Sequence, residues 1–309
     1  MTQLPNHSLE NTCQVDGIRC RIPKAALGAA TLALALSATA TLAAPLTINH
    51  MSDAGSVEFA FSSEVSDIFL SSYDRVGLSF DDSSLGDVYA GAFNGEAQSA
   101  EDDDSFDITT LYRNENEVIL YCLDIFNYLK YGSGFVKYNV FEFDKNVAEE
   151  PTTLTTLEDD TVVTGSIDNV LDFLGALNDE LTDNYSYGFG DRNWLNPANR
   201  WISGAIQVGI WESLYDETFN LSGGHFSVSG LKSEGKDLLD ATFGRMSTTS
   251  SLDNNQVLVF QPVNSETLVP LNGQTLIGDP VKVPTPGTLV LLLSGLFLLG
   301  KASWGRSQI

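Results

Sequence analysis

The sequence predicts an α+β domain in which an antiparallel β-sheet or sandwich receives a helical insertion. Apolar and polar residues alternate with the period of strands from Leu46 to about Val147. From Ser166 onward, apolar residues recur every three or four positions, which is the period of a helix. A strand pattern returns at residues 256–260, so we expect the helices to lie between strands of one domain.

Four segments of the first half carry the strand pattern. In each of them, aromatic or β-branched residues stand at alternate positions, and Gly, Asn, Asp and Ser separate the segments at turn-like intervals. The segments span residues 57–61, 75–80, 118–123 and 135–143. A returning strand is expected at 256–260, and a short one around 274–277.

Three segments predict helices. The first begins after Ser166, a residue type that favours the N-cap position, and its apolar residues share one face. These residues are Ile167, Val170, Leu171, Leu174, Leu177 and Leu181. The second helix is expected from Pro197 to about Asp216, because proline is favoured in a first turn. The third is expected from Ser229 to Phe243, although a glycine within it weakens the pattern.

The C-terminal segment has the order of a processing signal. A short proline-containing motif precedes an apolar run from Leu289 to Leu299 and a short tail. The motif residues are Val283, Pro284, Pro286 and Gly287. Both prolines fix φ and lack an N–H group, so the motif is extended and accessible. This order resembles the PEP-CTERM sorting signal that exosortases read, with Thr285 in place of the usual glutamate.

The resemblance implies two partners for this segment, an exosortase-like processing enzyme and the cytoplasmic membrane. Residues 288–304 would enter the membrane as a single hydrophobic helix, although the stretch is shorter than the ~20 residues of a full span. A buried helix of the domain core is the alternative interpretation. In the tail, Lys301 and Arg306 stand where the family usually has a cluster of arginines.

The N-terminal region has the three-part order of a secretory signal peptide. Basic residues at Arg19, Arg21 and Lys24 precede an Ala/Leu-rich run, and small residues near Ala40 and Ala43 offer a cleavage site for signal peptidase. An uncleaved anchor is the alternative, because the leader before the basic residues is long. The chain is therefore divided into a signal peptide (1–43), an exported α+β domain (44–262), a linker (263–282) and the sorting segment (283–309).

The composition excludes several classes of protein. A formal net charge of −25 repels nucleic acid and anionic lipid surfaces. A hydrophobic content of 43% and an aromatic content of 10% favour a packed core over disorder. Cys13 and Cys20 lie in the signal peptide, so Cys122 is the one cysteine of the exported chain and cannot form an internal disulfide. An intermolecular bond, an inert buried thiol and a chemical role are the open explanations for Cys122.

Two short segments carry the pair of residues with the clearest chemical interest. Cys122 follows Tyr121 at the end of a predicted strand, and Gln207 precedes Trp211 in the second predicted helix. These patterns resemble the surface thioester domains of Gram-positive adhesins, in which a cysteine and a glutamine join as an internal thioester. The resemblance implies a Cys122–Gln207 bond that an amine or hydroxyl of a partner could capture. The alternatives are an inert buried thiol and an ordinary hydrogen-bonded glutamine.

The helix that contains Gln207 is predicted to be amphipathic, with Gln207 beside its apolar face. That face comprises Trp201, Ala205, Val208, Trp211, Leu214 and Tyr215. The same Tyr-Cys and Gln…Ile-Trp-Glu pattern is also similar to one that recurs among PEP-CTERM proteins of unknown function.

Other candidate sites have weaker support. Asp102, Asp104 and Asp107 are a weak calcium candidate, since hard cations prefer clustered carboxylates, but they lack EF-hand spacing and a solvated loop is the alternative. The sequence has no nucleophile elbow, phosphate-binding loop or dinucleotide fingerprint. We therefore expect no cofactor, no bound metal and no catalytic residue.

The leading hypothesis is an exported, surface-sorted, non-enzymatic protein of the envelope or extracellular matrix. It would be membrane-anchored before sorting and then lie at the cell surface or outside the cell, with a surface glycan or a protein as its ligand. A covalent adhesin that uses Cys122 and Gln207 is the second hypothesis. A secreted hydrolase is the third, and only the abundance of acidic residues supports it.

Overall fold

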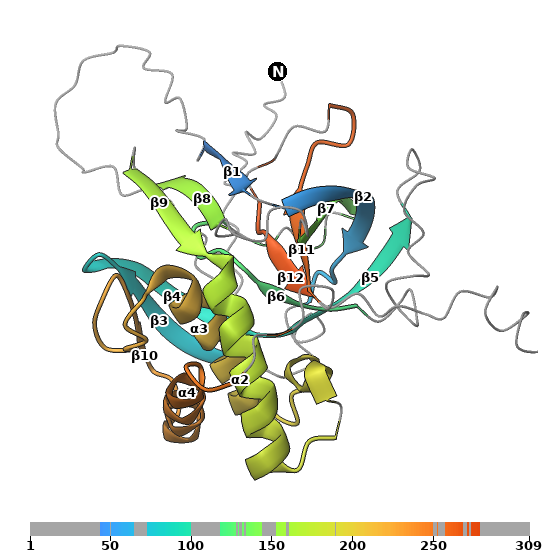
Figure 1. Ribbon diagram of the computed structural model, residues 1–309. Helices are drawn as coiled ribbons and strands as arrows, with labels where there is room; N and C mark the ends of the chain where they lie inside the picture. Colours follow the sequence, from blue (N-terminus) through green and yellow to red (C-terminus); the bar gives the residue numbers. More distant parts are fainter. Residues whose placement is uncertain are drawn as a thin grey trace, which may run out of the picture.

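Figure 1 shows the computed structural model of the chain, which describes a mixed α and β domain. The described residues are 44–49, 51–64, 73–99, 118–127, 129, 132, 134–143, 153–158, 161–188, 190–249, 252, 257–267, 271 and 273–278. The predicted signal peptide, the calcium candidates Asp102, Asp104 and Asp107, and the sorting segment with its hydrophobic helix lie outside these residues. Among the helices that are described, none combines the length and the apolar character that a membrane span requires.

Six strands form a closed barrel in which every neighbouring pair is antiparallel. In barrel order they are β11 (Leu258–Pro262), β12 (Leu276–Gly278), β6 (Val118–Cys122), β5 (Phe93–Ser99), β2 (Met51–Ala60) and β7 (Val136–Phe143). The predicted antiparallel pairing is confirmed, but the sheet closes instead of forming a sandwich. The reason is that β11 pairs with β7 on one side and with β12 on the other.

The barrel interior is filled by aromatic and aliphatic side chains. Phe59 lies 5.0 Å from Phe260 and 5.2 Å from Tyr138, measured between ring centroids, and all three side chains are buried. Contacts of this kind join β2, β11 and β7 across the barrel. The short strand β12 lies within the segment expected to be a linker, so residues beyond Pro262 also belong to the barrel.

Two three-stranded sheets accompany the barrel. One contains β1 (Ala44–Asn49), β8 (Thr153–Glu158) and β9 (Thr161–Ser166), and the other contains β10 (Phe226–Ser229), β3 (Tyr73–Phe80) and β4 (Ser83–Gly91). The β3–β4 hairpin turns through Asp81 and Asp82, whose φ angles of 46° and 60° are both positive. A two-residue hairpin turn favours this conformation, and aspartate tolerates it better than most residues.

The helices lie between β9 and β11, as the sequence predicts. They are α2 (Ile167–Tyr185), the short 3-10 helix η2 (Gly190–Leu195), α3 (Arg200–Tyr215) and α4 (Ser233–Arg245). Helix α2 begins where expected, because the Ser166 hydroxyl accepts the N–H of Asn169 at 3.2 Å.

Two of the predicted helix starts are too early. Helix α3 begins at Arg200 and not at Pro197, because the side chain of Asn199 caps it by accepting the N–H of Ile202 at 3.1 Å. Helix α4 begins at Ser233 and not at Ser229, because the preceding residues form β10 and Gly230 then turns the chain with a φ of 82°.

Helix α3 is buried on every side, which corrects the prediction of an amphipathic helix. All residues from Ile202 to Tyr215 are buried, whereas Trp201, expected on the core face, is only partly buried. The helix contacts α2, α4 and strands β3, β4, β9 and β10, so it occupies the space between the helical layer and the small sheets (Figure 1). Its polar side chains therefore lie inside the protein.

The contact between α3 and its helical neighbours requires a residue without a side chain. A Cβ added to Gly209 would overlap the ring of Phe173 on α2 and would lie 2.8 Å from the Cδ2 of Leu239 on α4. Gly209 therefore sets how closely the three helices approach one another.

We expect Gly209→Ala to lower the free energy of unfolding by about 1–3 kcal/mol, because the added methyl group overpacks the contact. Urea denaturation measures the change. Gly244→Ala is the matched control, since a Cβ at Gly244 on α4 meets nothing within 4 Å and alanine is the better helix former. Equal stability of the two variants would contradict the packing argument.

Candidate functional site

The structure brings Cys122 and Gln207 together from the end of β6 and the middle of α3. The carboxamide oxygen of Gln207 accepts the backbone N–H of Cys122 at 2.9 Å, and its Nε2 donates to the carbonyl of Cys122 at 2.8 Å. Gln207 is fully buried and Cys122 is 6% exposed. One side chain thus satisfies both backbone polar groups of the cysteine.

The position of Cys122 at the end of a strand pairing explains why these groups are available. Successive residues of an antiparallel strand bond to opposite neighbours. Leu123 donates its N–H to Thr275 on the β12 side, so the groups of Cys122 face the β5 side. The β5–β6 pairing stops at Phe93 and Leu120, and the carboxamide of Gln207 takes the place that another strand residue would occupy.

The reciprocal bonds fix the orientation of the carboxamide. The Oε1 atom faces a donor and the Nε2 atom faces an acceptor, so a flipped amide would lose both hydrogen bonds. The amide carbon is thereby held beside the backbone of Cys122, and the chain neighbours Tyr121, Ile206 and Val208 are fully buried. This places an electrophilic carbon and a sulfur in the same water-poor region.

The thiol of Cys122 is predominantly neutral at neutral pH. Burial raises its pKa well above the ordinary value, and the negative charge of Asp124 raises that pKa further. A neutral thiol is a weak nucleophile, so attack on the carboxamide requires the thiol proton to leave during the same step. The same environment limits the access of water to the sulfur.

Asp124 shapes the turn that follows Cys122. Its Oδ1 accepts the backbone N–H groups of Phe126 and Asn127 at 3.0 and 2.8 Å, and its Oδ2 accepts the N–H of Thr275 at 3.0 Å. Burial raises the pKa of this carboxyl, and the hydrogen bonds lower it in part. Because these acceptors are already used, we regard Asp124 as a residue that positions the turn.

Tyr121 anchors the other side of Cys122. Its hydroxyl donates to the carbonyl of Trp194 at 2.9 Å, and the two rings lie 5.8 Å apart. Trp194 is itself held by α2, because its backbone N–H donates to the side chain of Asn178 at 3.1 Å. The position of Cys122 therefore depends on α2 and η2 as well as on the barrel.

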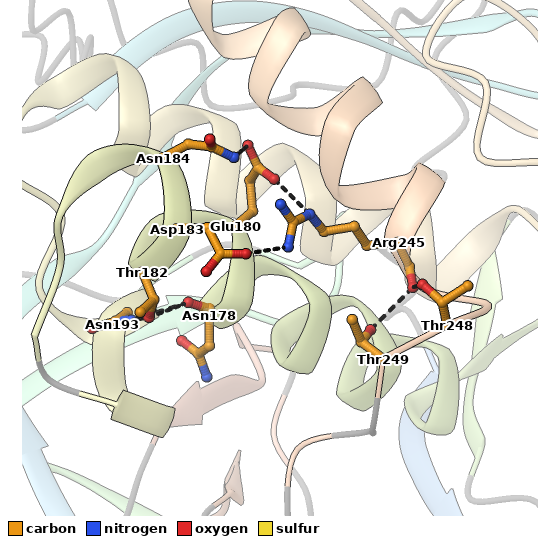
Figure 2. A network of polar contacts seen from close by, with 9 residues as sticks. All are labelled: Asn178, Glu180, Thr182, Asp183, Asn184, Asn193, Arg245, Thr248 and Thr249. Carbon is orange, nitrogen blue, oxygen red and sulfur yellow. Dashed lines mark hydrogen bonds and ion pairs between the residues drawn. The ribbon is translucent and has the colours of Figure 1, made fainter.

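A polar network fixes the end of α2 on which this support depends (Figure 2). Arg245 of α4 extends between Glu180 and Asp183, with its Nε 2.7 Å from Glu180 and its Nη1 2.8 Å from Asp183. On the opposite side of α2, the Asn193 side chain donates to the Asn178 carbonyl at 3.1 Å and to the Thr182 hydroxyl at 2.7 Å. The side chain of Glu180 is buried, so its ion pair with Arg245 also neutralises a negative charge inside the protein.

Glu212 of α3 is a buried acid that the sequence did not predict as part of any site. It is fully buried, and neither carboxylate oxygen has a hydrogen-bond partner among the residues that the structure describes. Burial and then the charge of Asp216 raise its pKa to about 8, while the nearby backbone N–H of Asn220 lowers it slightly. Glu212 is therefore mostly protonated at neutral pH.

The predicted sites have different outcomes. Cys122 and Gln207 meet, whereas the sorting motif and the calcium candidates lie outside the described residues. Across the described part of the chain, no three His, Cys, Asp or Glu side chains form a group that could hold a metal ion. The sequence patterns did not identify Trp194 or Glu212 as site residues. The available signals were a tryptophan in a Tyr/Gly/Asn-rich loop and an acid within an apolar helix.

Comparisons with known proteins give one distant likeness. No family model and no curated protein matches the sequence. The N-terminal thioester domain of a protein F2 like fibronectin-binding protein from Streptococcus pneumoniae is similar to this chain at 11% sequence identity. The match covers 71% of this chain and 98% of that chain, with a TM-score of 0.31. A TM-score of this size carries no argument about fold or function, so the proposals below depend on the geometry of this chain.

We expect Glu212→Gln to stabilise the protein increasingly as the pH rises. The folded state keeps the Glu212 proton up to a pH of about 8, whereas the unfolded chain releases it near the ordinary value of 4.5. The wild type therefore loses stability across this range, and glutamine removes the loss. Thermal unfolding in phosphate buffer at pH 5 and pH 8.5 measures the difference between the two proteins.

Glu96→Gln is the control for this measurement, because the Glu96 carboxylate is exposed on β5. It should show the same difference from wild type at both pH values. A Glu212→Gln variant whose difference from wild type is independent of pH would contradict the proposed protonation of Glu212.

Proposed function

We propose that this domain forms an internal thioester between Cys122 and Gln207 and uses it to attach covalently to a partner. The observation that carries the proposal is the fully buried Gln207 carboxamide, held by reciprocal hydrogen bonds on the backbone of Cys122. A glutamine with a purely structural role could form its hydrogen bonds with any buried polar group. Gln207 forms them, from the centre of the buried helix, with the one cysteine among the described residues.

The reaction has a complete balance of atoms. The Sγ atom of Cys122 forms a bond to the amide carbon of Gln207, and the carbon–nitrogen bond of the carboxamide breaks. The thiol proton passes to the departing nitrogen, which leaves as ammonia. The product is an acyl thioester, with no oxidant, metal or cofactor consumed.

The backbone of Cys122 also supplies stabilisation for the transition state. As sulfur attacks, negative charge develops on Oε1 of Gln207, which already accepts the Cys122 N–H at 2.9 Å. A preorganised donor in a water-poor site stabilises such an oxyanion more strongly than water does. The departing Nε2 loses its hydrogen bond to the Cys122 carbonyl, so formation replaces the carbon–nitrogen bond by a carbon–sulfur bond and gives up one hydrogen bond.

The thioester would act once and would not turn over. An amine of a partner attacks the acyl carbon, an amide bond forms, and the carbon–sulfur bond breaks to return the Cys122 thiol. This single event agrees with the expectation that the protein is not an enzyme. The small exposed fraction of Cys122, 6%, leaves a narrow approach for the nucleophile.

Export and surface sorting are the second part of the proposal. The signal-peptide pattern at residues 1–43 and the sorting pattern at 283–309 support secretion followed by processing of the C-terminal segment. A covalent attachment domain has its use outside the cell, where surface glycans and proteins present hydroxyl and amine groups. The envelope or extracellular matrix is therefore the proposed location.

The intact mass of the mature protein tests the thioester. We expect a mass lower than the sequence value by one ammonia, and we expect methylamine to add to the protein at Gln207. Cys122→Ala and Gln207→Ala should each abolish both effects. Gln98→Ala is the control, because Gln98 is bonded to Glu58 on the barrel and should leave both effects intact.

A mature protein with the full sequence mass and a freely titratable thiol after unfolding would exclude the thioester. The result is decisive only for protein purified without amine buffers, since amines consume the bond before measurement.

Deletion of residues 283–309 tests the sorting proposal. We expect the truncated protein to be released or to change its location, because the processing enzyme would have no recognition motif. Fractionation of cells and medium measures the distribution. Substitution of Pro284 and Pro286 together by alanine should reproduce the effect, while an unchanged distribution of both variants would contradict the sorting role.

A further inference from the structure

A pocket of about 720 Å³ lies at the C-terminal end of α3, and neither Cys122 nor Gln207 lines it. The walls come from the β3–β4 hairpin turn, the junction of β9 with α2, the end of α3 and the loop before β10. This volume lies in the range of pockets that bind organic ligands and exceeds what one metal ion fills. The ligand of this pocket in the exported protein is therefore independent of the thioester.

The pocket is strongly acidic. Asp81, Asp82, Asp216 and Glu217 line it, and no lysine or arginine is present among its lining residues. His225 is the one basic side chain there, and its Nδ1 lies 2.6 Å from Oδ1 of Asp81. His225 also interacts with the charges of Asp216 and Glu217, but one histidine cannot balance four carboxylates, so the field in the pocket favours a positively charged ligand.

Asp216 gives the observation that points to a ligand. It is only 3% exposed, and its Oδ1 accepts the N–H and the hydroxyl of Thr218 at 2.9 and 2.7 Å. Its Oδ2 is buried and has no partner among the described residues. A buried carboxylate oxygen without a donor is costly, and the cost disappears when a ligand supplies the donor.

Glu212 strengthens the same conclusion from one turn deeper in α3. Both of its oxygens are buried without a partner in the described part of the protein. The negative charge of Asp216 contributes to the raised pKa of Glu212, so the two acids lie close enough to repel each other. The carbonyl end of α3 lies at the same place and adds negative partial charge.

We propose that this pocket binds the ammonium group of an alkylamine, with Oδ2 of Asp216 as its principal acceptor. An ammonium group has three donors and suits a small number of carboxylate oxygens. Leu214 and Tyr215 also line the pocket and provide apolar surface for the alkyl chain.

The geometry favours an alkylammonium over a metal ion or an anion. Calcium takes six to eight oxygen ligands, whereas no group of three acidic or other metal-binding side chains suited to a metal exists among the described residues. An anion would face the pocket's carboxylates. The N-terminus of α2, which reaches this pocket, is already capped by Ser166.

The proposal is independent of the thioester, and the experiment keeps the two apart. Binding is measured on the Cys122→Ala variant of the exported chain, in which no acyl transfer to an amine can occur. Calorimetric titrations in cacodylate buffer, which contains no amine and does not precipitate calcium, use Nα-acetyl-lysine methylamide, spermidine, 1-pentanol and calcium chloride as separate probes. The first two represent a protein side chain and a free polyamine as sources of the same group.

We expect saturable binding of at least one alkylammonium probe and none of 1-pentanol. The probe that binds more tightly identifies the source. Asp216→Asn should weaken this binding about tenfold or more, because a charge-assisted hydrogen bond is lost. Glu266→Gln removes one exposed charge outside the pocket and should leave the binding unchanged.

Asp82→Asn is a second pocket variant in case Asp216→Asn fails to fold. Asparagine tolerates the positive φ of this turn position, so the variant removes charge with little strain. It should weaken binding several-fold. Three results would overturn the proposal. The first is that neither alkylammonium probe binds, and the second is that calcium binds and the amines do not. The third is that the pocket variants that fold bind the amines as tightly as the Cys122→Ala protein without a pocket substitution.

Discussion

The burial of α3 from Ile202 to Tyr215 is the constraint on which the rest of the structure depends. A helix without a solvent face must satisfy its polar side chains within the protein. Ser203 accepts the N–H of Ala92 between β4 and β5, and Gln207 takes both backbone groups of Cys122 at the end of β6. These two side chains fix the position of the helix relative to the strands. Apolar packing alone would define that position less specifically.

The middle and the C-terminal end of α3 differ in how well their polar groups are satisfied. Gln207 is fully paired, while Glu212 and one oxygen of Asp216 are buried without partners among the described residues. Asp216, the C-cap of α3, lies nine positions after Gln207, a rise of about 13.5 Å. The hydrogen bonds of Gln207 are suited to hold the reacting groups in a fixed geometry. The unpaired oxygens of Glu212 and Asp216 are suited to a ligand that donates hydrogen bonds. The two do not occupy the same space.

Sequence patterns predicted the class of fold and the main strands, since alternation and helical period report which side chains are buried. They missed strands such as β4 and β5, whose glycines and polar residues weaken the alternation. The pairing of Cys122 with Gln207 followed from a resemblance and not from periodicity. The support from Trp194 could not be predicted, because it depends on contacts between segments far apart in the chain.

The Cys122–Gln207 contact, at the place where the β5–β6 pairing stops, also has a consequence for the stability of the chain. The two residues are 85 positions apart in the sequence, and the chain has no other described cysteine with which to cross-link itself. A thioester at this place would close a long covalent loop and restrict the unfolded chain as a disulfide does, by about 4–5 kcal/mol in the entropic model. Capture of a partner would open that loop, so attachment would exchange internal rigidity for an external link.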